Sequence, residues 1–122
     1  MDDSAGEKLI YSCRISSVGF KKEVRGLDFF YKAYLTDKCL IIKAFFIFPF
    51  TIKKIFYHQI TNFEWMRKYA FEGIGIEYKT ESGKEKYLSL QRFTLVNKKS
   101  EDVLDSIFQL LKKKTNVYAK FG

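Results

Sequence analysis

Residues 27–45 carry the strongest fold signal, and they read LDFFYKAYLTDKCLIIKAF. In the first ten residues every second side chain falls on one face, namely Phe29, Tyr31, Ala33 and Leu35. A period of two predicts a strand. The polar pair Asp37-Lys38 then breaks the pattern, and residues 39–45 predict a second strand that runs antiparallel to the first. The sequence therefore predicts a short β-hairpin within a β-rich chain.

Further strands are predicted on both sides of this hairpin. Runs rich in β-branched and aromatic residues occur at 8–17, 27–36, 39–45, 51–56, 60–68, 73–79 and 86–91. Pro49 lacks an N–H group and is expected to limit the ladder before the fourth strand. Gly83 lies in the turn before the last strand, where a positive φ is needed. Alternation places four side chains inward, namely Ile74, Ile76, Leu88 and Leu90.

The pattern changes period near the C-terminus. Large apolar residues recur there at intervals of three and four, namely Val103, Leu104, Ile107, Phe108 and Leu111. This spacing predicts one amphipathic helix, with Ser100 as its N-cap and the basic run 112–114 at its C-terminal end. Because the apolar stripe cannot stay solvated, the helix must cover a face or an opening of the sheet.

The length of 122 residues fits a single domain spanning 1–122, with flexible ends at 1–7 and 115–122. The residues after Met1 are acidic where a targeting segment would be basic and then apolar, so we expect a cytoplasmic protein. The longest apolar stretch, 39–52, falls short of the ~20 residues that a membrane-spanning helix needs. We therefore expect no transmembrane segment.

The formal net charge of +8 favours acidic partners, such as anionic lipid headgroups, nucleic acid or acidic peptides, although solubility alone also explains it. The soft metal ligands are few. Cys13 and Cys39 have no CxxC spacing and, with the single His58, underfill a zinc site. No base lies within reach of a nucleophile in any recognisable pattern. We therefore expect no metal, no cofactor, no disulfide and no catalytic residue.

Four segments resemble the bacterial pleckstrin-homology (PH) and GRAM-like domains. The segment 34–42 is similar to a "Leu-Thr-Asp/Asn-basic-x-Leu" strand crossing, 53–60 to a "basic-Ile-x-Tyr-x-x-Ile" step, and 71–77 with 82–84 to a later hairpin. The resemblance runs from about Tyr34 to Leu111, roughly two-thirds of the chain. It implies a barrel or sandwich of about seven antiparallel strands in two near-orthogonal sheets, capped by one C-terminal helix. Domains of this family bind phosphoinositides, peptides or other proteins.

The family resemblance also directs attention to the segment Phe20-Lys21-Lys22-Glu23-Val24-Arg25. In the family this loop often presents basic residues to lipid headgroups, which implies that Phe20 inserts while Lys21, Lys22 and Arg25 meet phosphate. Lys53 and Lys54 would join them if they fold onto the same rim. Glu23 departs from the family pattern because it stands where a basic residue is expected, and a merely solvated loop is the alternative.

A second candidate is the segment Phe45-Phe46-Ile47-Phe48-Pro49-Phe50. Two interpretations stay open. In the first, the rest of the protein covers both faces of the segment, which the base rate for soluble monomers favours. In the second, an exposed patch is formed by Phe45, Phe46, Phe48 and Phe50. An exposed patch would imply a membrane or protein contact, including a homodimer, with an edge strand available for pairing.

Together these features predict a non-catalytic PH/GRAM-like binding module. Its partner would be another protein or an anionic membrane surface, to which it would be peripheral. Nucleic-acid binding is the rival class, and it would require an exposed platform made of Tyr69, Phe71 and Tyr78 with Lys68 and Lys79. We weigh it below the first hypothesis because strand alternation explains most of these aromatics as core. A small enzyme is a further alternative.

Overall fold

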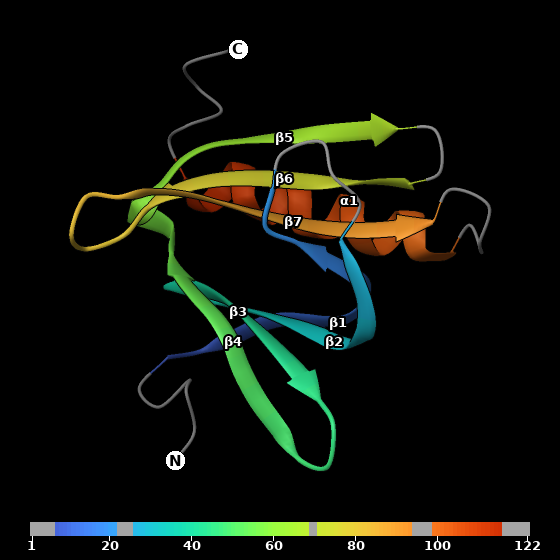
Figure 1. The fold of residues 1–122 in the computed structure, drawn as a ribbon. Helices are drawn as coiled ribbons and strands as arrows, with labels where there is room; N and C mark the ends of the chain where they lie inside the picture. The colour runs from blue at the N-terminus through green and yellow to red at the C-terminus, as the bar shows by residue number, and fades with distance from the viewer. Residues whose placement is uncertain (1–6, 22–25, 69–70, 94–98, 116–122) are drawn as a thin grey trace.

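A computed structural model describes residues 7–21, 26–68, 71–93 and 99–115 (Figure 1). These residues form a mainly β fold with one C-terminal helix. The elements are β1 (Leu9–Gly19), β2 (Leu27–Thr36), β3 (Cys39–Phe45), β4 (Pro49–Phe56), the short 3-10 helix η1 (Tyr57–Gln59), β5 (Ile60–Lys68), β6 (Phe71–Lys79), β7 (Glu85–Phe93) and α1 (Lys99–Lys114).

The predicted strands are all present, and β2, β3 and β5 have the predicted bounds. Pro49 is the first residue of β4, where it pairs with Phe45. Because β4 is an edge strand of the sheet, the missing N–H of Pro49 costs no ladder hydrogen bond on the outer side. Gly83 has a φ of 88°, as the turn before β7 requires.

The strands form one antiparallel sheet in the order β4-β3-β2-β1-β7-β6-β5. The predicted division into two near-orthogonal sheets is not confirmed, because β1 hydrogen-bonds to both neighbours. It pairs with β2 over most of its length and with β7 through Ser17–Gly19. The register of β1 with β2 shifts between Ile15 and Ser17. A bulge of this kind bends a strand, and Figure 1 shows β1 bending between its two partners.

The chain returns to β2 at a point where only glycine fits. A Cβ atom on Gly26 would lie 2.4 Å from the carbonyl carbon and oxygen of Val18 in β1. The Gly26 N–H also donates a hydrogen bond to Oε1 of Gln91 in β7, at 2.8 Å. This close crossing joins the start of β2 to the place where β1 meets β7.

The helix covers the β5–β7 part of the sheet, as its apolar stripe predicts. Leu104, Ile107 and Leu111 are buried in the same core as Ile74 and Leu90. The Phe108 ring packs at 5.2 Å from Phe63 and 6.1 Å from Trp65, measured between ring centroids. In Figure 1, α1 lies behind β6 and β7. The predicted N-cap is wrong, because the helix begins at Lys99 and Ser100 is already inside its first turn.

Two residues of the predicted flexible ends are described, Glu7 and Thr115, and both make hydrogen bonds. The Glu7 carboxylate accepts hydrogen bonds from Cys39 Sγ at 3.1 Å and Thr36 Oγ1 at 3.2 Å, and it pairs with Lys54 Nζ at 3.1 Å. Its side chain is only 8% exposed. Thr115 is buried, and its N–H and hydroxyl both donate to the Leu111 carbonyl. The remaining residues of 1–7 and 115–122 lie outside the described part of the chain.

Candidate functional site

The turn between β3 and β4 is an exposed apolar tip made of Phe46, Ile47 and Phe48. Their exposed fractions are 76%, 82% and 69%. Phe45 is paired with Pro49, so the three residues between them have no ladder partner. Figure 1 shows the β3–β4 hairpin extending away from α1 and β5–β7. The interpretation that this segment is covered is therefore wrong, and the exposed interpretation holds for Phe46, Phe48 and Phe50, whereas Phe45 is half-buried.

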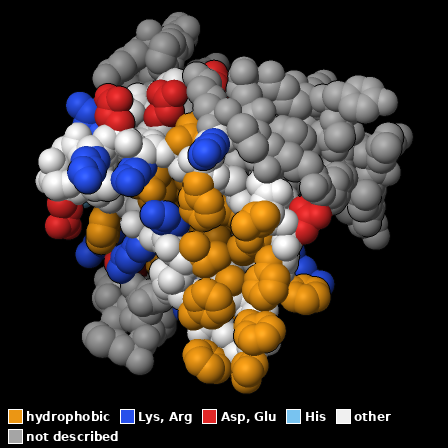
Figure 2. Space-filling model, viewed as in Figure 1, with side chains coloured by type: hydrophobic (Ala, Val, Ile, Leu, Met, Phe, Trp, Pro, Cys, Tyr) orange, Lys and Arg blue, Asp and Glu red, His pale blue; other side chains and the backbone are white. Residues whose placement is uncertain are grey.

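The tip belongs to a larger apolar surface. Phe50 is 47% exposed, and the neighbouring strand β2 adds Phe29 and Phe30, which are 40% and 74% exposed. We call the following set the aromatic surface: Phe29, Phe30, Phe45, Phe46, Ile47, Phe48 and Phe50. The Phe29 ring lies 6.3 Å from the ring of Phe46, between centroids. Figure 2 shows hydrophobic side chains gathered over the β3–β4 hairpin. Exposed apolar surface of this kind is typical of contact sites in other proteins.

Phe29 and Phe30 were missed because alternation alone assigns one of them to the core. The β2–β3 ladder ends at the pair Tyr31 and Ala44, so the first residues of β2 extend beyond the end of β3. Counting back from the turn at Asp37-Lys38 places Phe30 opposite Phe45 and Phe29 opposite Phe46. The hairpin register therefore predicts that Phe29 and Phe30 lie beside Phe45 and Phe46, whereas strand alternation alone does not.

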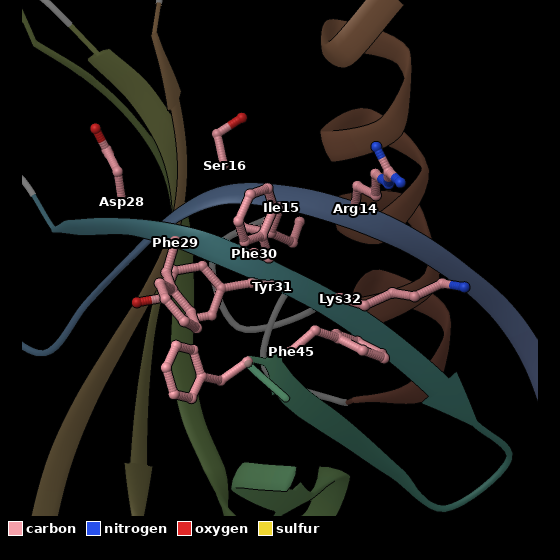
Figure 3. A pocket seen from close by; sticks show the side chains of 10 residues that line it. Arg14, Ile15, Ser16, Asp28, Phe29, Phe30, Tyr31, Lys32 and Phe45 are labelled. Atoms are coloured by element: carbon pink, nitrogen blue, oxygen red, sulfur yellow. The ribbon is translucent and has the colours of Figure 1, made fainter. Parts of the chain in front are cut away.

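A groove opens beside the aromatic surface, with a volume of about 960 Å³. It is lined by Arg14, Ile15, Ser16, Asp28, Phe29, Phe30, Tyr31, Lys32, Phe45 and Phe46. Aromatic rings supply one part of the lining, whereas Arg14, Lys32 and Ser16 supply basic and hydroxyl groups (Figure 3). Burial and the nearby charge of Asp28 raise the pKa of Tyr31 above its usual value, so its phenol is neutral at physiological pH. The groove thus offers both apolar and cationic contacts.

Three basic side chains stand in line across β1, β2 and β3. The register pairs Arg14 with Lys32, and Lys32 with Lys43. We call these three residues the basic row. The ring of Tyr34 lies among them, with Lys32 Nζ at 5.5 Å and Lys43 Nζ at 5.3 Å from its centroid. These cation–π contacts hold the ammonium groups on one face, although like charges on opposite strands destabilise a sheet.

Of the two basic residues predicted on β4, Lys53 lies beside the predicted segment that begins at Phe20, whereas Lys54 pairs with Glu7. Lys21 is exposed just after β1, whereas Lys22, Arg25 and Glu23 lie outside the described residues. Lys53 Nζ lies 5.8 Å from the ring centroid of Phe20, which is 46% exposed. Lys54 is the neighbour of Lys53 on β4, so it points to the opposite face, where it pairs with Glu7.

Both cysteines considered for chemistry are buried. Burial raises the pKa of the Cys13 thiol to about 12 and also raises that of Cys39. His58 is exposed in η1. Among the described residues, no three His, Cys, Asp or Glu side chains gather closely enough to hold a metal ion.

The aromatic platform predicted for nucleic-acid binding included Tyr78. This residue is only 6% exposed and belongs to the core, so it cannot stack on a base. Lys79 is exposed. Tyr69 and the side chains of Lys68 and Phe71 lie outside what the structure describes. A stacking platform that needs Tyr78 is therefore not available.

Comparison with known proteins adds a fold likeness. No protein-family model matches the chain, and no curated protein matches it. The crystal structure of the C-terminal domain of an unknown protein from Leishmania infantum is similar, with a TM-score of 0.54 and 20% identity. The match covers 92% of this chain and 87% of that one. At this identity the likeness shows the fold alone. In the described residues, no helix has the length and apolar character to span a membrane.

Proposed function

We propose that the protein is a non-catalytic PH/GRAM-like binding module that docks peripherally on an anionic, cytoplasmic membrane surface through its aromatic surface. The observation that carries this proposal is the tip of the β3–β4 hairpin, where Phe46, Ile47 and Phe48 are 69–82% exposed. Full burial of one such side chain is worth about 1.5–3 kcal/mol. A protein that leaves all three in water has a strong driving force to bury them.

The PH-like fold is part of the same proposal. Seven antiparallel strands followed by one C-terminal helix agree with the element order of that family. The bend of β1 at its register shift would let β1–β4 and β5–β7 act as two halves facing each other, which is the two-sheet arrangement of the family. The resemblance of the four sequence segments is the further support.

A bilayer suits the tip better than a folded protein partner does. Successive side chains in an extended or turning segment point in different directions, so no single flat surface can cover Phe46, Ile47 and Phe48 together. A fluid membrane interface surrounds an inserted hairpin from all sides. Aromatic side chains are also favoured at such interfaces.

Magnitudes explain why apolar and basic groups are needed together. A basic residue near an anionic leaflet contributes ~1 kcal/mol, so the three residues of the basic row supply about 3 kcal/mol, weaker than a millimolar interaction. Partial burial of the tip adds a comparable or larger amount. The sum is enough for reversible peripheral binding.

The absence of a catalytic role is also a proposal. It is supported by the two cysteines, which are buried and whose pKa values are raised, because a nucleophilic cysteine needs a lowered pKa and access. His58, the single histidine of the sequence, is exposed, and its ring lies 5.8 Å from that of Phe56, between ring centroids. We likewise propose that no cofactor is required.

A protein partner, including a second copy of the chain, is the second candidate. The observation that favours it is the groove of about 960 Å³ beside Phe29 and Phe30, together with the edge strand β4. An edge strand can accept a strand from another chain. Such an apolar interface would be insensitive to lipid charge and would persist at high salt.

Vesicle co-sedimentation of the purified protein tests the proposed function. We expect about tenfold or more tighter binding to phosphatidylcholine vesicles that contain phosphatidylserine than to phosphatidylcholine alone, because the basic groups act only on an anionic surface. Raising the salt should weaken this binding without removing its apolar part. No pelleting with either vesicle, combined with a salt-resistant dimer in solution, would refute the membrane function in favour of the protein interface.

A further inference from the structure

We infer that the basic row, Arg14, Lys32 and Lys43, binds the phosphate groups of anionic phospholipids around the inserted hairpin. This inference rests on the proposed membrane function and names the residues that recognise the headgroups. It assigns recognition to the outer face of β1, β2 and β3 and not to the segment 20–25 that the sequence favoured.

The first support is the depth that the basic row would reach in the membrane interface when the hairpin tip is inserted. Lys43 precedes Phe46 by three residues, which on an extended strand corresponds to about 10 Å. Apolar groups of peripheral proteins enter the boundary between headgroups and acyl chains by roughly 5–10 Å. When the tip is inserted along the hairpin axis, the basic row therefore lies at the level of the lipid phosphates. Arg14 and Lys32 share this level because they are in register with Lys43.

The second support is the chemistry of the row. Arg14 is exposed, and its guanidinium presents a planar fork of donors that fits a phosphate. No described residue makes a hydrogen bond or ion pair with the Arg14 side chain. Lys32 and Lys43 are positioned over Tyr34, so less side-chain freedom is lost when they bind. Arg14 and Lys32 belong both to the basic row and to the lining of the groove.

The third support is continuity between the row and the aromatic surface. The hairpin register places Phe30 and Phe45 one step from Lys32 and Lys43, toward the tip. In Figure 3 the nitrogen ends of Arg14 and Lys32 point away from the rings of Phe29 and Tyr31. A ligand along this surface meets cations first and aromatic rings next, which is the order of a phospholipid from headgroup to acyl chain.

The other described basic residues near the hairpin are less suited. Lys54 pairs with Glu7 at 3.1 Å, so its charge is partly compensated by a carboxylate of the protein itself. Lys53 lies on the opposite face of β4, over Phe20. Asp28 is the acidic residue that lines the groove, and it lies at the β1–β2 end, four residues along β2 from Lys32. The row is therefore the set of three cations that lie in register beside the aromatic surface.

The test compares two double variants that remove the same charge. In Arg14→Gln/Lys32→Gln the row is disrupted, and in Lys84→Gln/Lys86→Gln two exposed lysines of the β6–β7 hairpin are neutralised. We measure partition of each into vesicles of phosphatidylcholine with phosphatidylserine. The first variant is expected to bind about thirtyfold more weakly than the wild type, and the second within threefold of it. Binding to pure phosphatidylcholine should be unchanged in both.

The outcomes separate this inference from the proposed function. Equal losses in the two variants would show that only net charge matters and would overturn the basic row, while the membrane function would stand. Full binding by Arg14→Gln/Lys32→Gln would also overturn the row. A wild type that binds no vesicle would overturn both. Near-native circular dichroism and thermal melting of the variants exclude misfolding as the cause of a loss.

Discussion

A chain in which Phe46 and Phe48 are both replaced by serine is expected to bind anionic vesicles about a hundredfold more weakly than the wild type. The two rings are 76% and 69% exposed, so they pack little against the rest of the protein. Burying a fully exposed ring is worth about 1.5–3 kcal/mol, so burying the exposed parts of these two rings is worth roughly 2–4 kcal/mol together, close to the 2.7 kcal/mol of a hundredfold change. Thermal stability should be preserved, because no core contact is removed.

The matched control is Leu9→Ser/Ile10→Ser. These two residues are also exposed apolar side chains, at 50% and 42%, but they begin β1, next to the far end of β2 at Thr36. Their replacement should leave vesicle binding within a few-fold of the wild type. If the control variant loses as much binding as the tip variant, general surface hydrophobicity and not the hairpin tip is responsible.

Replacing Glu7 by glutamine is expected to lower the free energy of unfolding by about 1 to 3 kcal/mol at neutral pH. Its carboxylate joins the start of β1 to β2, β3 and β4 by accepting from Thr36 and Cys39 and pairing with Lys54. Glutamine has a similar shape but no charge, so the charge-assisted contact with Lys54 is lost. Urea unfolding at several pH values measures the difference.

The same contact predicts how the difference depends on pH. The hydrogen bond from Cys39, followed by the hydrogen bond and charge of Lys54, holds the pKa of Glu7 below its ordinary value of 4.5 in the folded protein. A lowered folded-state pKa stabilises the fold at pH values above the ordinary one, and this stabilisation disappears as the pH falls through the lowered pKa. The gap between wild type and Glu7→Gln should therefore close on acidification below about pH 4.5. A constant gap would contradict the role of the charge.

The fold was largely predictable because its signals are local. Period-two alternation, the turn at Asp37-Lys38 and the apolar stripe around Ile107 each determine an element without knowledge of distant residues. The two-sheet division was not confirmed because it depends on whether the end of β1 reaches β7, and a strand pattern does not state its partner. Ser100 was misplaced as a cap by a similar ambiguity of helix boundaries.

The candidate site was predictable only in part. Composition singled out the segment Phe45–Phe50, but whether it is buried depends on what the fold brings beside it, and nothing covers Ile47 in the described part of the structure. The basic row was not recognised, because its members are far apart in sequence and become neighbours only through strand register. The ion pair of Lys54 with Glu7 could not be predicted, because Glu7 precedes Lys54 by more than 40 residues.

Insertion of the hairpin tip is tested most directly by fluorescence of a Phe48→Trp variant in the presence of vesicles. The wild type contains a single tryptophan, Trp65, which packs against Phe108 and serves as the control. With vesicles whose acyl chains carry bromine, the added fluorescence of the variant should shift to the blue and be quenched, while the Trp65 signal of the wild type stays unchanged. Unquenched fluorescence from a variant that still sediments with the vesicles would show that the tip remains outside the membrane.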